Sequence, residues 1–289
     1  MIRIFTDSAA NIPAVIAKKQ QIDIIPLTYT VNGAESGAQP EDFDGSDYYN
    51  KIRHGATVKT SMINPDMFIG RFEEALKNDD DIIYIGLSGG ISGTVQAARN
   101  AAEELSCKYG ERKVEIIDSL GASLGEGMLA LRAADLVKKN MGIDEIKSEI
   151  ASLIPHMCQC FTVDDLKYLK QGGRISGAAA LIGGLLGIRP VLIGDGEGRI
   201  VMLSKCRGSK QVLDALAERY GKLVTDTSSM IGIAHADNPS GVSYLLERLH
   251  KKGFCGKELT VCYEPVTGAH VGPGAVALFF FGSDRCAGI

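Results

Sequence analysis

The chain has 289 residues, enough to bury a large core, and this length predicts two domains. Its composition is that of a globular protein, with 45% hydrophobic and 23% charged residues. The formal net charge of −4 excludes the broad basic field of proteins that bind nucleic acid or anionic membranes. An anionic ligand therefore has to be bound by a local group of residues.

The seven cysteines are scattered, and only Cys158 and Cys160 lie close together. Because there are no paired C-x-x-C motifs, the sequence predicts no metal site and no metal cofactor. Cysteines that form neither disulfides nor metal sites are typical of proteins in a reducing compartment. The chain runs from Met1 directly into a strand pattern, so we expect no signal peptide and a cytoplasmic protein.

One segment, residues 175–188, is apolar or small throughout and is bracketed by Arg174 and Arg189. It is 14 residues long, whereas a membrane-spanning helix needs about 20. We therefore expect no integral membrane segment. The segment is interpreted as a core helix or as the wall of an apolar cavity.

Strand and helix signals alternate through residues 1–155. This order predicts an α/β domain whose parallel sheet is covered by helices on both faces. Ligands of such sheets bind beyond the carboxyl ends of the strands. The expected strands are residues 2–5, 22–27, 82–85 and 114–117, and the expected helices are 13–20, 65–77, 94–108 and 121–139, with Asn64 as the N-cap of the second helix.

Residues 156–289 are interpreted as an α+β domain with a mixed or antiparallel sheet, because hairpins and helices join its strands. The boundary near residue 155 leaves room for segments exchanged between the domains, and a ligand is expected between them. The expected strands are residues 157–162, 190–193, 199–205, 230–235, 259–263 and 275–281, and the expected helices are 145–154, 163–171, 210–220 and 240–252.

The loop from Gly86 to Thr94 carries four glycines and three hydroxyl residues between an expected strand and an expected helix. Free backbone N–H groups and hydroxyls at a helix N-terminus stabilise an anion. Ser92, at the start of the helix, is therefore a candidate ligand-binding residue. The alternative is a glycine-rich turn that only packs the helix on the sheet.

Residues 86–90 also match G-x-S-x-G, the nucleophile elbow of α/β-hydrolases. A serine esterase that uses Ser88 is thus an alternative function. Glycines at positions 89, 90 and 93 oppose it, because they delay the helix that must follow the serine directly. A binding module for another small anion, such as a phosphorylated metabolite, is a third possibility.

Three further side chains are candidates for binding an anion. Thr60 belongs to a hydroxyl pair before Asn64, a pattern that most often caps a helix. Arg174 follows a glycine pair, where its guanidinium can bind a carboxylate in a bidentate manner. His270 lies in a segment of three glycines and two prolines that reads as a rigid loop before an apolar strand.

Six segments, in order and spread over both halves, resemble the DegV family of bacterial lipid-binding proteins. The match covers essentially the whole chain. Its motifs are F-T-D-S at 5–8, K-T-S at 59–61, L-S-G-G-I-S-G-T at 87–94, L-K-Q-G-G-R-I at 169–175, L-L-G-I-R-P at 185–190 and G-A-H-V-G-P-G at 268–274.

The resemblance implies a two-domain α/β protein that holds one long-chain fatty acid between its domains. It implies a carboxylate bound by Thr60 and Ser92, with Arg174 and His270 nearby. It also implies a carrier without catalytic activity, which presents the carboxylate to a separate fatty acid kinase subunit that makes the acyl phosphate for phospholipid synthesis.

The chain departs from the family pattern in the loop, where Gly89 replaces a second serine, and after Thr60-Ser61, where Met62-Ile63-Asn64 stands in place of the single Q before proline. The carrier interpretation agrees with the chemistry of the residues, because a buried carboxylate needs hydrogen-bond donors. We expect the small and apolar residues 178–186 to line a slot for the acyl tail.

Overall fold

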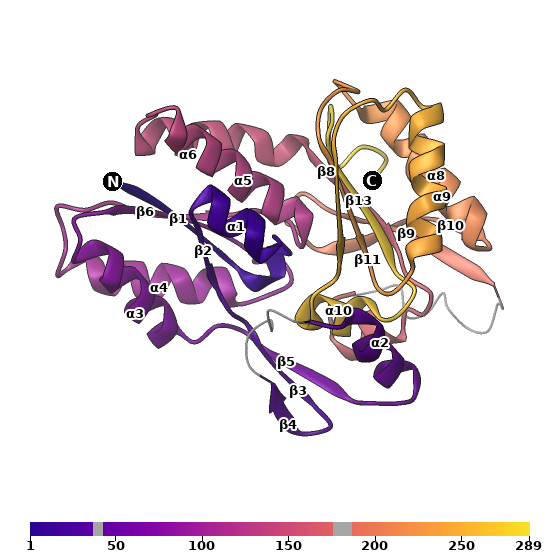
Figure 1. The fold of residues 1–289 in the computed structure, drawn as a ribbon, viewed down its shortest axis with the longest axis horizontal. Coiled ribbons are helices and arrows are strands. Elements are labelled where there is room, and N and C mark those ends of the chain that lie inside the picture. Colours follow the sequence, from indigo (N-terminus) through magenta and orange to yellow (C-terminus); the bar gives the residue numbers. More distant parts are fainter. Residues whose placement is uncertain (37–42, 176–186) are drawn as a thin grey trace.

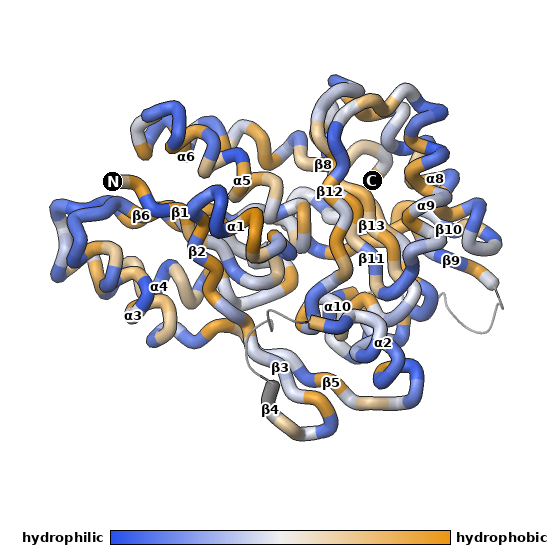
Figure 2. Tube along the Cα trace, in the orientation of Figure 1, coloured by the Kyte–Doolittle hydropathy of each residue, from blue (hydrophilic) through white to orange (hydrophobic). Residues whose placement is uncertain are grey.

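The computed structural model describes residues 1–36, 43–175 and 187–289, which form two lobes, each built around a β-sheet (Figure 1). Apolar residues concentrate on the strands, and hydrophilic residues on the outward faces of the helices (Figure 2). The first lobe has a parallel sheet and the second a mixed sheet. The α/β class predicted from the sequence is confirmed.

The sheet of the first lobe has four parallel strands, and its middle is fully buried. The chain passes from β1 to β2 and later returns to β6 on the other side of β1. The loops after β1 and β6 therefore diverge, which in open α/β sheets creates a ligand crevice. In order across the sheet the strands are β2 (Ile22–Ile25), β1 (Ile2–Asp7), β6 (Asp81–Gly86) and β7 (Val114–Asp118).

Helices cover both faces of this sheet (Figure 1). Asn64 caps α3 as predicted: its side chain accepts the N–H of Asp66 at 3.1 Å, and Pro65 occupies the first helical position. One face carries α3 (Pro65–Leu76) and α4 (Thr94–Ser106), and the other carries α1 (Ala14–Gln20), α5 (Leu124–Lys138) and α6 (Ile143–Leu153), with short 3-10 turns η1 (Ser8–Ala10) and η2 (Ile154–His156).

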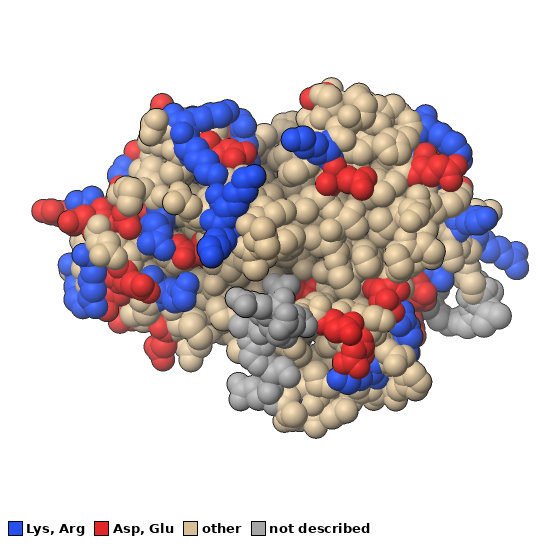
Figure 3. Space-filling view, viewed as in Figure 1, with Lys and Arg blue, Asp and Glu red and all other residues tan. Residues whose placement is uncertain are grey.

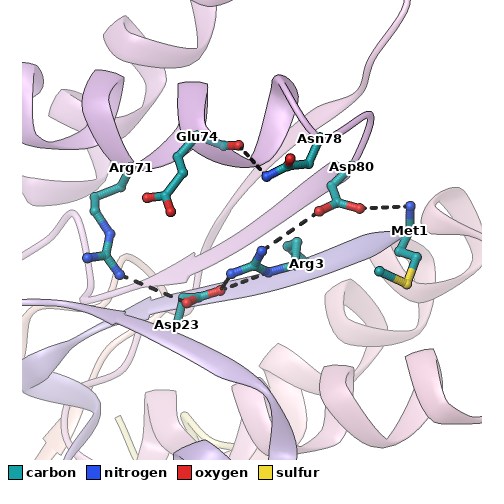
Figure 4. Close-up of polar contacts among 7 residues, drawn as sticks. All are labelled: Met1, Arg3, Asp23, Arg71, Glu74, Asn78 and Asp80. Carbon is teal, nitrogen blue, oxygen red and sulfur yellow. Dashed lines mark hydrogen bonds and ion pairs between the residues drawn. The ribbon is translucent and has the colours of Figure 1, made fainter.

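Ion pairs close the amino end of this sheet (Figure 4). Arg3 at the start of β1 places Nη2 2.5 Å from Oδ2 of Asp23 and Nη1 3.8 Å from Oδ2 of Asp80. Nη2 of Arg71 lies 3.9 Å from Oδ1 of Asp23, and the Met1 amino group lies 2.9 Å from Oδ1 of Asp80. The opposite, carboxyl end is left for the ligand crevice.

The second lobe contains a six-stranded sheet, and among its described strands only β11 and β12 pair in parallel. β9 and β10 form the antiparallel hairpin that the sequence predicts. In order the strands are β10 (Ile200–Arg207), β9 (Ile188–Gly194), β8 (Met157–Thr162), β13 (Val276–Phe281), β11 (Ile231–His235) and β12 (Glu258–Cys262).

Side-chain alternation along β13 separates the two faces of this sheet. Val276, Leu278 and Phe280 belong to the core cluster under α8 (Ser209–Leu223) and α9 (Pro239–Lys251). Ala277 and Phe279 belong instead to the large cluster that continues into the first lobe. The sheet therefore presents one apolar face to the space between the lobes.

A small antiparallel sheet and one helix from the first quarter of the chain pack on the second lobe (Figure 1). The hydroxyl of Tyr48 donates to the carbonyl of Pro265 at 2.7 Å, and that of Tyr49 donates to Tyr263 at 2.8 Å. The sequence did not predict this unit. It comprises β4 (Ala34–Ser36), β3 (Thr28–Val31), β5 (Val58–Ser61) and α2 (Gly45–Arg53), and it contacts α10 (Pro265–Val271), which in turn packs on α7 (Lys167–Gln171).

Two local predictions are wrong. Thr60 and Ser61 do not cap a helix but end strand β5. His270 does not lie in a loop but in α10, because Pro265 starts a helix whose first N–H groups are accepted by the buried carboxylate of Glu264. Gly268 is needed there for packing, since a Cβ at this position would lie 2.1 Å from the Tyr49 hydroxyl.

The predicted slot for an acyl tail, residues 178–186, lies wholly outside the described residues. Among the residues that are described, no helix is long and apolar enough to cross a membrane. The same residues contain no group of three or more His, Cys, Asp or Glu placed to hold a metal ion. The strands of the four-stranded sheet all precede residue 155 and those of the six-stranded sheet all follow it, and the domain boundary there stays a prediction.

Candidate functional site

A cavity lies between the lobes, at the carboxyl ends of β6 and β7. It leaves about 900 Å³ free of protein atoms, its open mouth included. Thr60, Ser92, Arg174 and His270 all line it, although they come from β5, the loop before α4, the turn after α7, and α10. The structure thus brings together all four residues singled out in the sequence.

Thr60 and His270 are in direct contact, with 2.9 Å between Oγ1 and Nε2. Burial, reinforced by the nearby charge of Arg174, lowers the pKa of His270 to about 4. The imidazole is therefore neutral at physiological pH. It packs directly on the turn after α7, where a Cβ on Gly172 would lie 2.3 Å from Nδ1.

Two backbone carbonyls fix the half-buried guanidinium of Arg174. Nε donates to the carbonyl of Ile91 at 3.1 Å, and Nη1 donates to the carbonyl of Gly172. Nη2 has no partner in the described part of the chain, and no described carboxylate pairs with this arginine. An oriented cation with a free donor therefore faces the cavity, which suits an anion.

Ser92 lies two residues before Thr94, at the N-terminus of α4. Its Oγ lies 2.9 Å from Oγ1 of Thr94 and accepts the N–H of Thr94 at 3.2 Å. The backbone N–H of Ser92 donates to the carbonyl of Ser88 at 3.0 Å, which holds the loop in place. The positive end of the helix dipole adds to the attraction for an anion here.

Ser88, the residue at the centre of the G-x-S-x-G match, is fully buried. Its hydroxyl donates to the carbonyl of Gly198 in the turn between β9 and β10 at 2.9 Å and accepts the N–H of Gly90 at 3.1 Å. A nucleophilic serine has to reach its substrate and pass its proton to a base. This hydroxyl does neither and instead joins the two lobes.

Asp7 is buried where the loops after β1 and β6 diverge. Oδ2 accepts the Tyr84 hydroxyl at 2.7 Å and the N–H of Leu87 at 3.0 Å, and Oδ1 accepts the N–H of Ala9 at 2.9 Å. Burial raises the pKa of Asp7 above its ordinary value. The carboxyl group ties the two loops together and does not line the cavity.

Sequence reasoning predicted an apolar wall at residues 178–186 but missed the apolar walls that the described residues provide. Phe161, Ala277 and Phe279 line the cavity from β8 and β13. The unbroken apolar run of β13 was the available signal, because a strand that is apolar on both faces must be covered on each of them. Other walls come from the loops after β2, β6 and β7 and from α10, including Leu27, Leu87, Leu120, Ala122 and Val266.

Comparison with known proteins gives a consistent picture. A family model described as an uncharacterised protein of the DegV family matches residues 1–283. A DegV domain-containing protein of Clostridium perfringens is 36% identical over 290 residues, which covers 98% of each chain.

Solved structures agree with this match. The structure of a DegV family protein from Thermus thermophilus, described for its fatty acid binding, has a TM-score of 0.88 at 28% identity and covers 98% of this chain and 99% of that one. A fatty acid binding DegV family protein of Streptococcus agalactiae has a TM-score of 0.87 at 26% identity, with the same coverage. The chain is a member of the DegV family.

Proposed function

We propose that this chain binds one long-chain fatty acid in the cavity between its lobes. The observation that carries the proposal is the meeting of four polar side chains from four separate segments at one end of a cavity whose other walls are largely apolar. DegV proteins of Thermus thermophilus and Bacillus subtilis, at 28% identity each, are described as fatty acid binding. Their similarity over nearly the whole chain supports the same ligand class.

The polar end is suited to a carboxylate. Removing a carboxylate from water is very costly unless hydrogen bonds replace the lost hydration. The Thr60 and Ser92 hydroxyls and Nη2 of Arg174 supply three donors. When Thr60 gives its single proton to the carboxylate, its oxygen accepts from Nε2–H of His270, 2.9 Å away, so the neutral imidazole adopts the Nε2–H tautomer.

The apolar walls are suited to the acyl tail. Burial of a sixteen-carbon chain at about 0.8 kcal/mol per CH₂ gives a gross gain on the order of 12 kcal/mol. A gain of this size keeps the lipid bound through purification. The tail would extend between β8 and β13 on one side and the loops after β6 and β7 on the other.

We further propose that the chain has no catalytic activity of its own and presents the carboxylate to a separate fatty acid kinase subunit, which forms the acyl phosphate for phospholipid synthesis. The family resemblance supports this role. So does the placement of the polar end, because Thr60, Arg174 and His270 also line a second, solvent-open cleft from which a partner can reach the carboxylate.

Mass spectrometry of an organic extract from the denatured protein tests the ligand. We expect roughly one long-chain fatty acid per chain. A protein that carries no lipid and does not take up oleate or palmitate after stripping would contradict the proposal. The kinase role is tested separately, by formation of acyl phosphate when the loaded chain is mixed with a fatty acid kinase subunit and ATP.

A further inference from the structure

Gln159 places an amide group in the apolar wall of the cavity. It lies on β8 opposite Phe279 of β13, and both side chains line the cavity. The residues proposed to bind the carboxylate lie beyond one end of these strands, because the turn after α7 with Arg174 follows β8, and α10 with His270 precedes β13. On the proposed function, Gln159 therefore faces the acyl tail and not the carboxylate.

The position of Gln159 along β8 sets the part of the tail that it faces. It lies three residues before Thr162, the last residue of the strand, which is about 10 Å at about 3.3 Å per residue. An extended chain advances about 1.2 Å per bond, because three backbone bonds of a polypeptide cover about 3.3–3.6 Å. A fatty acid whose carboxylate lies beside Arg174 therefore reaches Gln159 after about eight bonds or more, near the middle of an eighteen-carbon chain.

The Gln159 amide is held in one orientation. Oε1 accepts the N–H of Ala122 at 3.3 Å, and Nε2 donates one hydrogen to the carbonyl of Leu120 at 3.0 Å. Glycines crowd around it, since a Cβ on Gly125 would lie 2.9 Å from Oε1 and one on Gly194 would lie 3.2 Å from Nε2. An amide nitrogen carries two hydrogens, and the second has no partner in the described part of the chain.

A buried cation lies next to this amide. Arg285 is only 3% exposed, and its Nη2 donates at 2.5 Å to the same carbonyl of Leu120. A Cβ on Gly194 would lie 2.8 Å from this Nη2, so Arg285 and Gln159 meet over one glycine of the cavity wall. Nε and Nη1 of Arg285 are buried and have no partner among the described residues.

This buried charge needs more acceptors than the described residues supply. On the face shown in Figure 3, Lys and Arg are interspersed with Asp and Glu. Arg285, in contrast, forms no ion pair with a described carboxylate. Burial of a cation is costly unless oxygen atoms replace its lost hydration. The inner part of the cavity therefore has a spare N–H donor on Gln159 and, beside it, further spare donors on Arg285.

A purely structural role accounts for only part of this arrangement. The two hydrogen bonds of Gln159 to the loop after β7 join the second lobe to the first. They use Oε1 and one hydrogen of Nε2, and they leave the other hydrogen unused. They also give no partner to Nε and Nη1 of Arg285. A ligand atom that accepts a hydrogen bond would complete the arrangement, and an unsubstituted acyl chain has no such atom at this depth.

We propose that this inner part of the cavity is a second polar site, which selects a long-chain fatty acid with a keto or hydroxyl oxygen near the middle of its chain. The inference rests on the proposed function, because it concerns the tail of the same ligand. The oxygen accepts the free N–H of Gln159, and the positive charge of Arg285 beside the amide attracts its lone pairs. An unsubstituted chain places a CH₂ group there and leaves the N–H without a partner.

Competition against a fluorescent fatty acid on the lipid-stripped full chain tests this inference. The probes are stearate, a pair of oxostearates and a pair of hydroxystearates, with the oxygen of each pair at carbon 10 or at carbon 17. The two members of a pair have the same formula and give up nearly the same hydration, so only the position of the oxygen separates them. We expect the carbon-10 member of at least one pair to bind roughly three- to tenfold more tightly than the carbon-17 member.

Gln159→Met keeps the length of the side chain, removes the amide and should abolish the preference for the carbon-10 member. Phe161→Leu, on the same strand and in the same wall, is the control, which should weaken the binding of all probes alike and keep the preference. The comparison of isomers on the unchanged chain needs no substitution, so it stands even where Gln159→Met fails to fold.

Equal affinity within both pairs, a preference for the carbon-17 member, or a preference that survives in Gln159→Met would overturn the inference and leave the proposed function standing. Failure of the unchanged chain to bind stearate would contradict the proposed function instead.

Discussion

The Thr60 hydroxyl lies 2.9 Å from Nε2 of His270, although 210 positions separate the two residues along the chain. Thr60 ends a strand of the small sheet, and His270 lies on α10 of the second lobe. The mouth of the cavity therefore exists only when these two parts are docked.

Replacing Thr60 with valine keeps the shape of the side chain and removes its hydroxyl. A hydrogen bond to a charged group contributes about 1.5–3 kcal/mol. We therefore expect palmitate affinity to fall roughly 10- to 100-fold, whereas the ligand-free protein should lose only about 0.5–1.5 kcal/mol of stability with its hydrogen bond to His270. Thr30→Val, on the neighbouring strand β3, is the matched control, and an equal loss of affinity in both variants would show that the sheet has been disturbed.

The lowered pKa of His270 predicts a pH-dependent stability. The native imidazole has a pKa of about 4 and the unfolded one about 6.5, so between these values the unfolded chain binds more protons. The free energy of unfolding of the ligand-free protein should therefore fall as pH drops from 6.5 to 4, with a contribution of at most about 1.4 kcal/mol per pH unit from this group.

Urea unfolding of the His270→Gln variant across that range checks the sign. The free energy of unfolding should fall less per pH unit in this variant than in the unchanged chain. His250→Gln, on α9, is the control for the loss of one histidine. A slope that is the same in all three proteins would mean that His270 titrates normally.

Glu126 is expected to be protonated in the folded protein. Burial, with the nearby charge of Asp7, raises its pKa well above the ordinary value. The geometry agrees, because the Thr6 hydroxyl lies 2.8 Å from both the Ile85 carbonyl and Oε1 of Glu126 and has only one proton to give. When Thr6 donates to the carbonyl, the carboxyl group has to donate to Thr6.

Because the pKa of Glu126 is raised in the folded protein, the free energy of unfolding should fall as pH rises above the pKa of the unfolded chain, near 4.5. Glu126→Gln, which resembles the protonated acid, should therefore be more stable than the unchanged chain at pH 8, and the difference should shrink toward pH 5. Thermal unfolding at both pH values measures this. Glu149→Gln, at a surface ion pair with Arg132, should shift stability by no more than about 0.5 kcal/mol.

Ser88→Ala separates the carrier from the esterase interpretation. Removal of a buried hydroxyl that joins Gly198 and Gly90 should cost about 1–3 kcal/mol of stability. Palmitate should still bind, and a fluorophosphonate probe should label neither protein. Labelling of the unchanged chain that disappears in the variant would support the esterase. Ser92→Ala is expected to act in the opposite way, with weaker palmitate binding and little loss of stability.

The contact between the Gly86–Thr94 loop and the β9–β10 turn requires a glycine. A Cβ on Gly90 would lie 2.4 Å from the carbonyl oxygen of Glu197 and 2.7 Å from the backbone carbon of Gly198. Gly90→Ala should therefore push the lobes apart and cost about 1–3 kcal/mol. Gly196→Ala, in the same turn, meets nothing within 4 Å and should leave the unfolding midpoint in place.

The long elements of both lobes were predictable because their periodicity is strong and their limits are marked by capping residues such as Asn64. The unit formed by β3, β4, α2 and β5 was not predictable. Its strands are three or four residues long, too short for a period to show. Contacts of Tyr48 and Tyr49 with residues 217 and 214 positions away stabilise it. Tertiary contacts of this kind leave no local pattern in the sequence.

The residues of the candidate site likewise divide into those with a clear local signal in the sequence and those without one. Ser92 had a local signal, a hydroxyl at the start of a helix. Thr60 and His270 had ambiguous local signals, and their glycine, proline and hydroxyl neighbours pointed to the wrong element in each case. What linked them was the order of six family motifs. The walls from β8 and β13 went unnoticed because β13 is apolar on both faces and β8 carries its polar Gln159 on the face that lines the cavity. Only the three-dimensional arrangement shows which face meets the other lobe.

The hydrogen bonds from Tyr48 and Tyr49 to Pro265 and Tyr263 also constrain the order in which the chain folds during its synthesis. A ribosome adds about 5–20 residues per second, so roughly 10–40 s pass between translation of the two tyrosines and translation of the carbonyls that they need. During that interval the first lobe can form its parallel sheet. The part of the second lobe on which the small sheet packs has not yet been synthesised. On the proposed function, a fatty acid can therefore be loaded only when translation is nearly complete.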